Sequence, residues 1–235
     1  MYIGTVIEIN ETGTSMRYKP GLLIGGKLSH ECSLSRSIGW YIEGLLALAP
    51  LCKNALQLEL TGITNDSFDL SVDTLTLVTL PLLKNFGLDG INLKIKKRGA
   101  APKGGGLVEF ICPTVRELKS VYITDPGLVK RVRGIGFCTR VSPTIITRVI
   151  DASRGVLNNL LPDVYINTDH HKGSNGGLSP GYSLCLVAET TSGALISAER
   201  MAVSGAGAGG ELPENIGKEG AILLLEEISQ GKSKL

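Results

Sequence analysis

Cysteine, histidine and aromatic residues are scarce in this sequence, and this scarcity narrows its chemistry. The 235 residues include five cysteines, three histidines and one tryptophan. The cysteines are odd in number, widely separated and never spaced as C-x-x-C, which predicts reduced, mostly buried thiols instead of disulfides or a zinc site. They are Cys32, Cys52, Cys112, Cys138 and Cys185.

Long apolar runs are also missing. No stretch reaches the roughly eighteen apolar residues that cross a bilayer, so no membrane partner is expected. The first residues carry neither the basic region nor the apolar core of a secretion signal, which favours a cytosolic or nuclear protein. A hydrophobic content of 43% and a mean hydropathy of +0.17 nevertheless predict a sizeable folded core.

The formal net charge of +2 is too small to indicate nucleic-acid binding by itself, but the charges are unevenly distributed. Two basic clusters and an acidic C-terminal region fit RNA phosphates at one face and a protein partner at another, and they also fit ordinary solvated surfaces. No aromatic residues are interleaved with the basic clusters, so base stacking is not expected. The clusters are Lys94, Lys96, Lys97, Arg98 and Lys103, then Lys130, Arg131, Arg133 and Arg140, and the acidic group is Glu211, Glu214, Glu219, Glu226 and Glu227.

The most distinctive stretch is RGAAPKGGG at residues 98–106. Alternating residues at 91–97 and a mostly apolar run at 107–112 predict a loop between two strands. Three consecutive glycines allow positive φ and let another backbone or an anion approach closely. Because Arg98 and Lys103 flank these amides, the loop is a candidate phosphate cradle, and simple turn chemistry is the alternative.

Hydrophobic periodicity along the chain predicts an α/β protein. Ser71 and Ser142 are expected to cap helices, Pro81 to kink one, and the glycine-rich residues 203–210 to form a flexible link. Strands are predicted at 4–10, 14–18, 27–34, 55–60, 91–97, 107–112, 131–139, 163–168, 182–189 and 194–198, and helices at 36–49, 71–86, 142–161 and 213–229.

The pattern R-G-x-x-P-x-G-G-G followed by an apolar residue resembles the signature of the RNA 3'-terminal phosphate cyclase family. Similarity extends from about Val6 to Gly231 and is greatest to the eukaryotic cyclase-like branch. The accompanying motifs are NETGT at 10–14, KPG at 19–21 with Gly25-Gly26, GITND at 62–66, SVD at 71–73, RVSP at 140–143, SPG at 179–181 and AETT at 188–191.

This resemblance implies an α/β (α+β) fold of repeated βαβαββ-type units, similar to the C-terminal domain of translation initiation factor three, with a smaller inserted α/β domain. Residues 1–123 would form the first part of the large domain, 124–205 the insert, and 206–235 the return to the large domain. Because the family usually continues at both ends, a truncated chain is expected. Such a chain would expose sheet edges and apolar helix faces and would tend to aggregate.

The resemblance also implies a non-catalytic role. The expected function is in small-subunit (18S) rRNA processing and 40S assembly within the nucleolar processome, in the nucleus and nucleolus, without a cofactor. A nucleolar GTPase of the processome is the expected partner, and pre-ribosomal RNA is a second candidate. The alternatives are an ATP-dependent RNA 3'-terminal phosphate cyclase and an α/β protein unrelated to RNA.

Few residues are candidates for chemistry. True cyclases form an adenylylated histidine near the C-terminus, and none of His30, His170 and His171 falls in that motif, so no catalytic residue is predicted. The expected site is electrostatic, with arginine favoured for bidentate phosphate contact. The candidate anion- or RNA-binding residues are Arg17, Lys19, Arg98, Lys103, Gly104, Gly105, Gly106, Arg133 and Arg140.

Two acidic patterns leave metal alternatives open, although no metal is predicted. Asp66, Asp69 and Asp73 lie close together and could hold magnesium, whereas a turn role for Asp66 and a helix N-terminal role for Asp73 are the simpler reading. The triplet at 169–171 spells the D-H-H of a phosphoesterase superfamily, but that superfamily needs further aspartates on separate strands.

Overall fold

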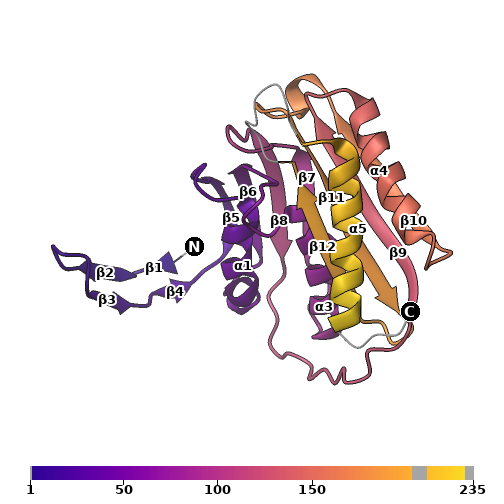
Figure 1. Ribbon diagram of the computed structural model, residues 1–235. Coiled ribbons are helices and arrows are strands. Elements are labelled where there is room, and N and C mark those ends of the chain that lie inside the picture. Colours follow the sequence, from indigo (N-terminus) through magenta and orange to yellow (C-terminus); the bar gives the residue numbers. More distant parts are fainter. Residues whose placement is uncertain (1, 203–210, 231–235) are drawn as a thin grey trace.

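Two four-stranded sheets with their helices form the body of the molecule, and a thin arm extends from it (Figure 1). The computed structural model describes residues 2–202 and 211–230. Its mixed sheets and helices confirm the expected α/β class. None of the helices in these two ranges is long and apolar enough to cross a membrane.

The arm is the N-terminal part of the chain. Its inner end pairs β1 with β4, and its outer end is the hairpin predicted around the NETGT turn, in which the side chain of Asn10 bonds to Thr12 and Thr14. The hairpin projects away from both sheets, and Ile9 and Met16 are 63% and 64% exposed (Figure 1). The arm strands are β1 (Tyr2–Ile3), β2 (Val6–Ile9), β3 (Met16–Lys19) and β4 (Leu22–Leu23).

The first sheet has the order β5-β6-β8-β7, with β5 parallel to β6 and the other pairs antiparallel. Alternation of apolar and polar residues along β6 turns Leu56, Leu58 and Leu60 towards the helices. Along the chain, the elements of this half follow in the order strand, helix, strand, helix, strand, strand. This order is the expected βαβαββ unit. Its elements are β5 (Gly26–Glu31), α1 (Ile38–Leu48), η1 (Ala49–Leu51), β6 (Leu56–Gly62), the helical segment 72–85, β7 (Asn92–Lys97) and β8 (Gly106–Cys112).

The helical segment 72–85 lies between the two sheets and is irregular. It consists of α2 (Val72–Thr74), the π turn η2 (Leu75–Thr79) and α3 (Leu80–Asn85). Ser71 caps it as predicted, because its hydroxyl accepts a hydrogen bond from the Thr74 amide. A kink was predicted at Pro81, and the helix forms a π turn just before this residue. Proline has no amide N–H to donate, so the helix changes its hydrogen-bond register nearby.

The second sheet has the order β10-β9-β11-β12. β9 and β10 are parallel and are joined through α4, whereas β11 pairs antiparallel with both β9 and β12. α4 and α5 cover one face of this sheet (Figure 1). The elements are β9 (Val129–Thr139), α4 (Pro143–Leu157), β10 (Val164–His171), η3 (Gly173–Asn175), β11 (Gly181–Thr190), β12 (Leu195–Met201) and α5 (Pro213–Gln230).

The position of α5 corrects the assignment of residues 206–235 to the large domain. Its apolar stripe enters the core formed by α4 and the second sheet, where Ile216 and Leu224 are fully buried. Arg148 of α4 also binds Glu214 in two hydrogen bonds of 2.6 and 2.8 Å. α5 therefore completes the insert. The flexible link predicted at 203–210 lies outside the described residues.

Replacement of Ser142 by alanine tests the start of α4. The Ser142 hydroxyl accepts a hydrogen bond from the Thr144 amide, and loss of such a cap costs about 1 kcal/mol. We expect urea denaturation to show this decrease in the free energy of unfolding. Ser174→Ala, at an exposed serine of η3, is the control and should change stability by less than about 0.5 kcal/mol. Equal effects of the two substitutions would refute a capping role.

Candidate functional site

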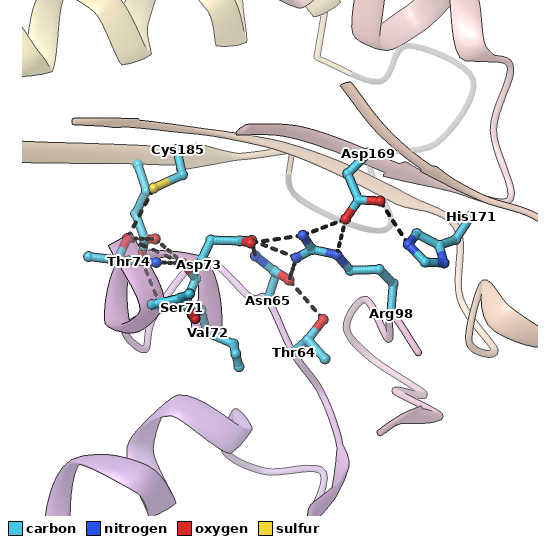
Figure 2. A network of polar contacts seen from close by, with 12 residues as sticks. Thr64, Asn65, Ser71, Val72, Asp73, Thr74, Arg98, Asp169, His171 and Cys185 are labelled. Carbon is cyan, nitrogen blue, oxygen red and sulfur yellow. Dashed lines mark hydrogen bonds and ion pairs between the residues drawn. The ribbon is translucent and has the colours of Figure 1, made fainter. Parts of the chain in front are cut away.

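A buried ion-pair network joins the βαβαββ unit to the insert (Figure 2). Arg98 follows β7, Asp73 lies on α2 and Asp169 lies near the end of β10. Arg98 stands directly after β7 of the first sheet and contacts Asp169 of the second sheet. The network therefore depends on both halves of the molecule being docked.

Every nitrogen of the Arg98 guanidinium donates to an acceptor. Nη1 and Nη2 donate to the two oxygens of Asp73 at 2.6 and 2.8 Å. Nε and Nη2 reach one oxygen of Asp169 at 2.8 and 2.7 Å, and Nη1 also donates to Asn65 Oδ1 at 3.2 Å. The guanidinium lies 4.8 Å from the ring centroid of Phe137 and its side chain is only 2% exposed.

The carboxylates of this network have further partners that fix their orientation (Figure 2). Asn65 Nδ2 donates to Asp73 Oδ2 at 3.0 Å, and Thr64 Oγ1 donates to Asn65 Oδ1 at 2.8 Å. His171 Nε2 lies 2.7 Å from Asp169 Oδ1. Thr64, Asn65, Asp73 and Arg98 are buried, and buried polar groups stabilise a fold only when they are hydrogen-bonded, as these four are.

These contacts decide the charge and the role of Arg98. Burial by itself lowers its pKa, but the negative charges of Asp73 and Asp169 outweigh that effect and hold the pKa above the ordinary arginine value. Arg98 is thus a fixed positive charge whose guanidinium is engaged by two carboxylates. Phosphate contact by Arg98 stays a prediction, and a phosphate would have to displace these carboxylates.

A second contact links the insert to the start of α2. The carboxylate of Glu199, on β12, accepts hydrogen bonds from the Ser71 amide at 3.1 Å and from Thr74 Oγ1 at 2.7 Å. The same Thr74 hydroxyl lies 3.3 Å from Cys185 Sγ. Burial raises the pKa of Cys185, so its thiol is unreactive at neutral pH. All five cysteines are buried and free, as predicted.

The glycine loop packs against the insert. Gly104 O accepts a hydrogen bond from the Leu178 amide at 2.9 Å, and the Lys103 amide donates to Ser179 Oγ at 3.0 Å. A Cβ on Gly177 would lie 2.6 Å from both Arg98 O and Gly104 O, closer than atoms can approach. The glycines therefore let two backbones approach each other.

Anion contact by this loop remains a prediction for the groups still available. The amides of Lys103 and Gly104 are engaged with Ser179 and Ala100. The side chain of Lys103 is exposed, Gly105 is partly buried and Gly106 begins β8. Any anion at this loop would meet mainly the Lys103 ammonium.

The remaining candidates are not gathered at one place. Arg17 and Lys19 lie on the hairpin arm, away from the body that contains the glycine loop (Figure 1). Arg133 pairs with Asp163, and Arg140, at φ 55°, donates from Nε to Gly177 O at 2.7 Å. RNA contact by these four residues stays a prediction. Of the four, Arg140 lies beside the glycine loop, because its partner Gly177 packs against Arg98 O and Gly104 O.

The acidic alternatives have structural partners. Asp66 Oδ1 accepts from the amides of Phe68 and Asp69, which is the predicted turn role. Hydrogen bonding from Arg36 lowers the pKa of Asp69, and Asp73 binds Arg98 instead of acting only on its helix terminus. Within residues 2–202 and 211–230, no group of three or more histidine, cysteine or acidic side chains is placed to hold a metal ion.

Sequence analysis missed the partners of Arg98 because no local pattern marks them. Asp73 and Asp169 lie 25 and 71 residues away along the chain. Asp73 was assigned to a helix terminus and Asp169 to a three-letter motif, each explained by its neighbours in sequence. The only available signal was that a basic residue stood between an apolar strand and a glycine loop.

Comparison with known proteins supports the fold and the motifs. The sequence profile described as RNA 3'-terminal phosphate cyclase (RTC), insert domain, matches residues 124–229, a range that includes all of α5 except its last residue. The RNA 3'-terminal phosphate cyclase-like protein of Homo sapiens is 53% identical over 231 residues, which cover 97% of this chain and 62% of the human protein.

Other relatives show similar identity and coverage. A probable RNA 3'-terminal phosphate cyclase-like protein of Dictyostelium discoideum is 47% identical, with 97% of this chain and 65% of the relative covered. The rRNA processing protein rcl1 of Schizosaccharomyces pombe is 45% identical, with 97% and 62% covered. The chain thus spans slightly under two thirds of the length of these relatives. The insert, the βαβαββ unit and these identities show that the chain belongs to the RNA 3'-terminal phosphate cyclase family, among its cyclase-like members.

Proposed function

We propose that this protein is a non-catalytic ribosome biogenesis factor that acts in small-subunit (18S) rRNA processing and 40S assembly. The observation that carries the proposal is the 45% identity, along 97% of this chain, to a yeast relative named an rRNA processing protein. Other relatives are named cyclase-like. A role in processing without cyclase chemistry agrees with both kinds of name.

The engagement of the motif residues supports this proposal. Arg98, the charged residue at the head of the loop, binds Asp73 and Asp169, and the glycines accommodate residues 177–179 of the insert. In this chain the loop therefore holds two halves together. A rigid two-part body suits a protein that presents surfaces to an assembling particle.

The proposal also covers the location of the protein in the cell and the molecules that it works with. We propose that the protein works in the nucleolus, in the processome, together with its GTPase and close to pre-ribosomal RNA. The exposed side chains of Arg17, Lys19, Lys103 and Arg140 are among the charged groups available for RNA phosphates. The apolar side chains of the hairpin arm are available for a protein.

Depletion of the protein in its own cells tests this proposal. Hybridisation of ribosomal RNA precursors should show accumulation of unprocessed small-subunit precursors with normal large-subunit RNA. Re-expression of the wild-type protein should restore processing, and re-expression of an Arg98→Met variant should not, because its two halves would no longer be locked together. Normal precursors, with a loss of cyclic-phosphate RNA ends, would instead assign the protein to the cyclases.

A further inference from the structure

Phe68 is the most exposed of the large apolar side chains in the described part of the chain, at 94%. It stands in loop 65–71, which follows β6 and is firmly held. Asp66 Oδ1 accepts hydrogen bonds from the amides of Phe68 and Asp69 at 3.0 and 2.7 Å, and Asp69 binds Arg36. The exposed ring is therefore presented by an ordered turn.

Two pockets flank this ring at the seam between the βαβαββ unit and the insert. The larger, of about 270 Å³, lies between loop 65–71 and residues 183 and 199–201 of the insert. The smaller, of about 150 Å³, lies between residues 66–68, Ala101, Pro102 and residues 201–202. Each pocket has walls from both halves of the molecule.

Acidic side chains outnumber basic ones in the lining of the larger pocket, although the charge of Arg36 also acts on Asp66. Asp66 and Glu199 both line it, and each bonds only to amide or hydroxyl donors, so that within residues 2–202 and 211–230 neither forms an ion pair with lysine or arginine. Arg200 also lines the pocket, but it is paired with Glu211 and Glu219 at 2.7 and 2.8 Å. Asp69 is likewise paired with Arg36.

We propose that this seam binds an extended segment of a partner protein through an arginine or lysine side chain. The cation would enter the larger pocket, between the face of Phe68 and the carboxylates of Asp66 and Glu199, where the ring and the charges attract it together. A small apolar residue of the same segment would occupy the smaller pocket beside Pro102.

The chemistry of the seam favours this occupant over the others. RNA phosphates would be repelled by the two unpaired carboxylates. A second copy of the chain would have to bring an exposed basic segment of its own, whereas any basic segment of a partner satisfies the pocket. The inference stands apart from the proposed function, because it is tested by binding alone.

Peptide binding to the full chain tests the proposal. The probe is a fluorescein-labelled peptide Gly-Arg-Ala-Arg-Gly, compared by fluorescence anisotropy with the same peptide in which citrulline replaces arginine. We expect the arginine peptide to bind and its affinity to fall as salt is added, whereas the citrulline peptide should not bind. Phe68→Ala should weaken binding about three- to fivefold, the size of an exposed cation–π contact.

Matched variants separate the seam from general effects. Tyr122→Ala removes another aromatic ring that is 88% exposed and should leave binding unchanged. Glu199→Gln keeps an oxygen that accepts from the Ser71 amide, and its Nε2 can donate to the Thr74 hydroxyl once that hydroxyl rotates, so the variant should fold, as checked by thermal unfolding. Loss of the charge should weaken binding by about fivefold or more.

Four results would overturn the proposal. One is the absence of arginine-peptide binding at millimolar concentration. The second is equal binding by the wild type and the Phe68→Ala variant, and the third is equal binding of the arginine and citrulline peptides. The fourth is binding of a labelled single-stranded RNA that is lost in Phe68→Ala, which would assign the seam to RNA.

Discussion

Replacement of Arg98 by methionine should lower the free energy of unfolding by about 3–5 kcal/mol, the cost of breaking a buried ion pair on one side. Methionine fits the space of the arginine stem but leaves Asp73, whose side chain is 4% exposed, without the cation that pairs with it. Asp169 loses its ion pair with Arg98 as well. The two halves of the molecule would then face each other with two unneutralised carboxylates between them.

Urea denaturation followed by circular dichroism measures this loss. Arg17→Met is the matched control, because Arg17 is 84% exposed on the hairpin arm and its removal should change stability by less than about 0.5 kcal/mol. Arg98→Lys should retain part of the stability, since an ammonium keeps the charge but cannot reproduce the five contacts of the guanidinium with four oxygens. A loss below about 1 kcal/mol for Arg98→Met would show that the network does not hold the halves together.

Replacement of Gly217 by alanine should destabilise the insert by about 1–3 kcal/mol through overpacking. A Cβ at this position of α5 would lie 2.1 Å from the carbonyl oxygen of Val149 on α4, so the two helices would have to separate. The backbone of α4 cannot yield as a flexible side chain would. This cost exceeds the roughly 1 kcal/mol by which alanine ordinarily favours a helix over glycine.

Gly155→Ala is the control for this prediction. Gly155 lies on α4 with open space where a Cβ would go, so alanine there should stabilise the protein by about 0.5–1 kcal/mol. Thermal and urea unfolding of the two variants should therefore change in opposite directions. Stabilisation by both substitutions would mean that α5 does not pack on α4, and would restore the assignment of this helix to the large domain.

Much of the fold was predictable because its signals are local. The stripe of apolar residues in α1, the alternation along β6 and the cap at Ser71 each depend on residues a few positions apart. Such signals indicate an element and its buried face. They also located the glycine loop between β7 and β8.

The prediction was wrong for α5, because the local sequence does not determine which half of the molecule a helix packs against. The stripe of α5 shows which side is buried, but both halves of the molecule offer apolar surfaces that could receive it, and only the close approach at Gly217 and the pairing of Glu214 with Arg148 decide for the insert. Family resemblance placed this helix with the wrong half.

Arg98 shows the same difference between local sequence features and tertiary contacts at a single residue. The sequence by itself determined that a basic side chain stands beside a flexible glycine loop, a description that fits a phosphate site. Only the tertiary structure decided that Asp73 and Asp169 meet it there. The physical reason is that charge and backbone freedom belong to the residue, whereas burial and ion pairing depend on segments brought together from distant parts of the chain.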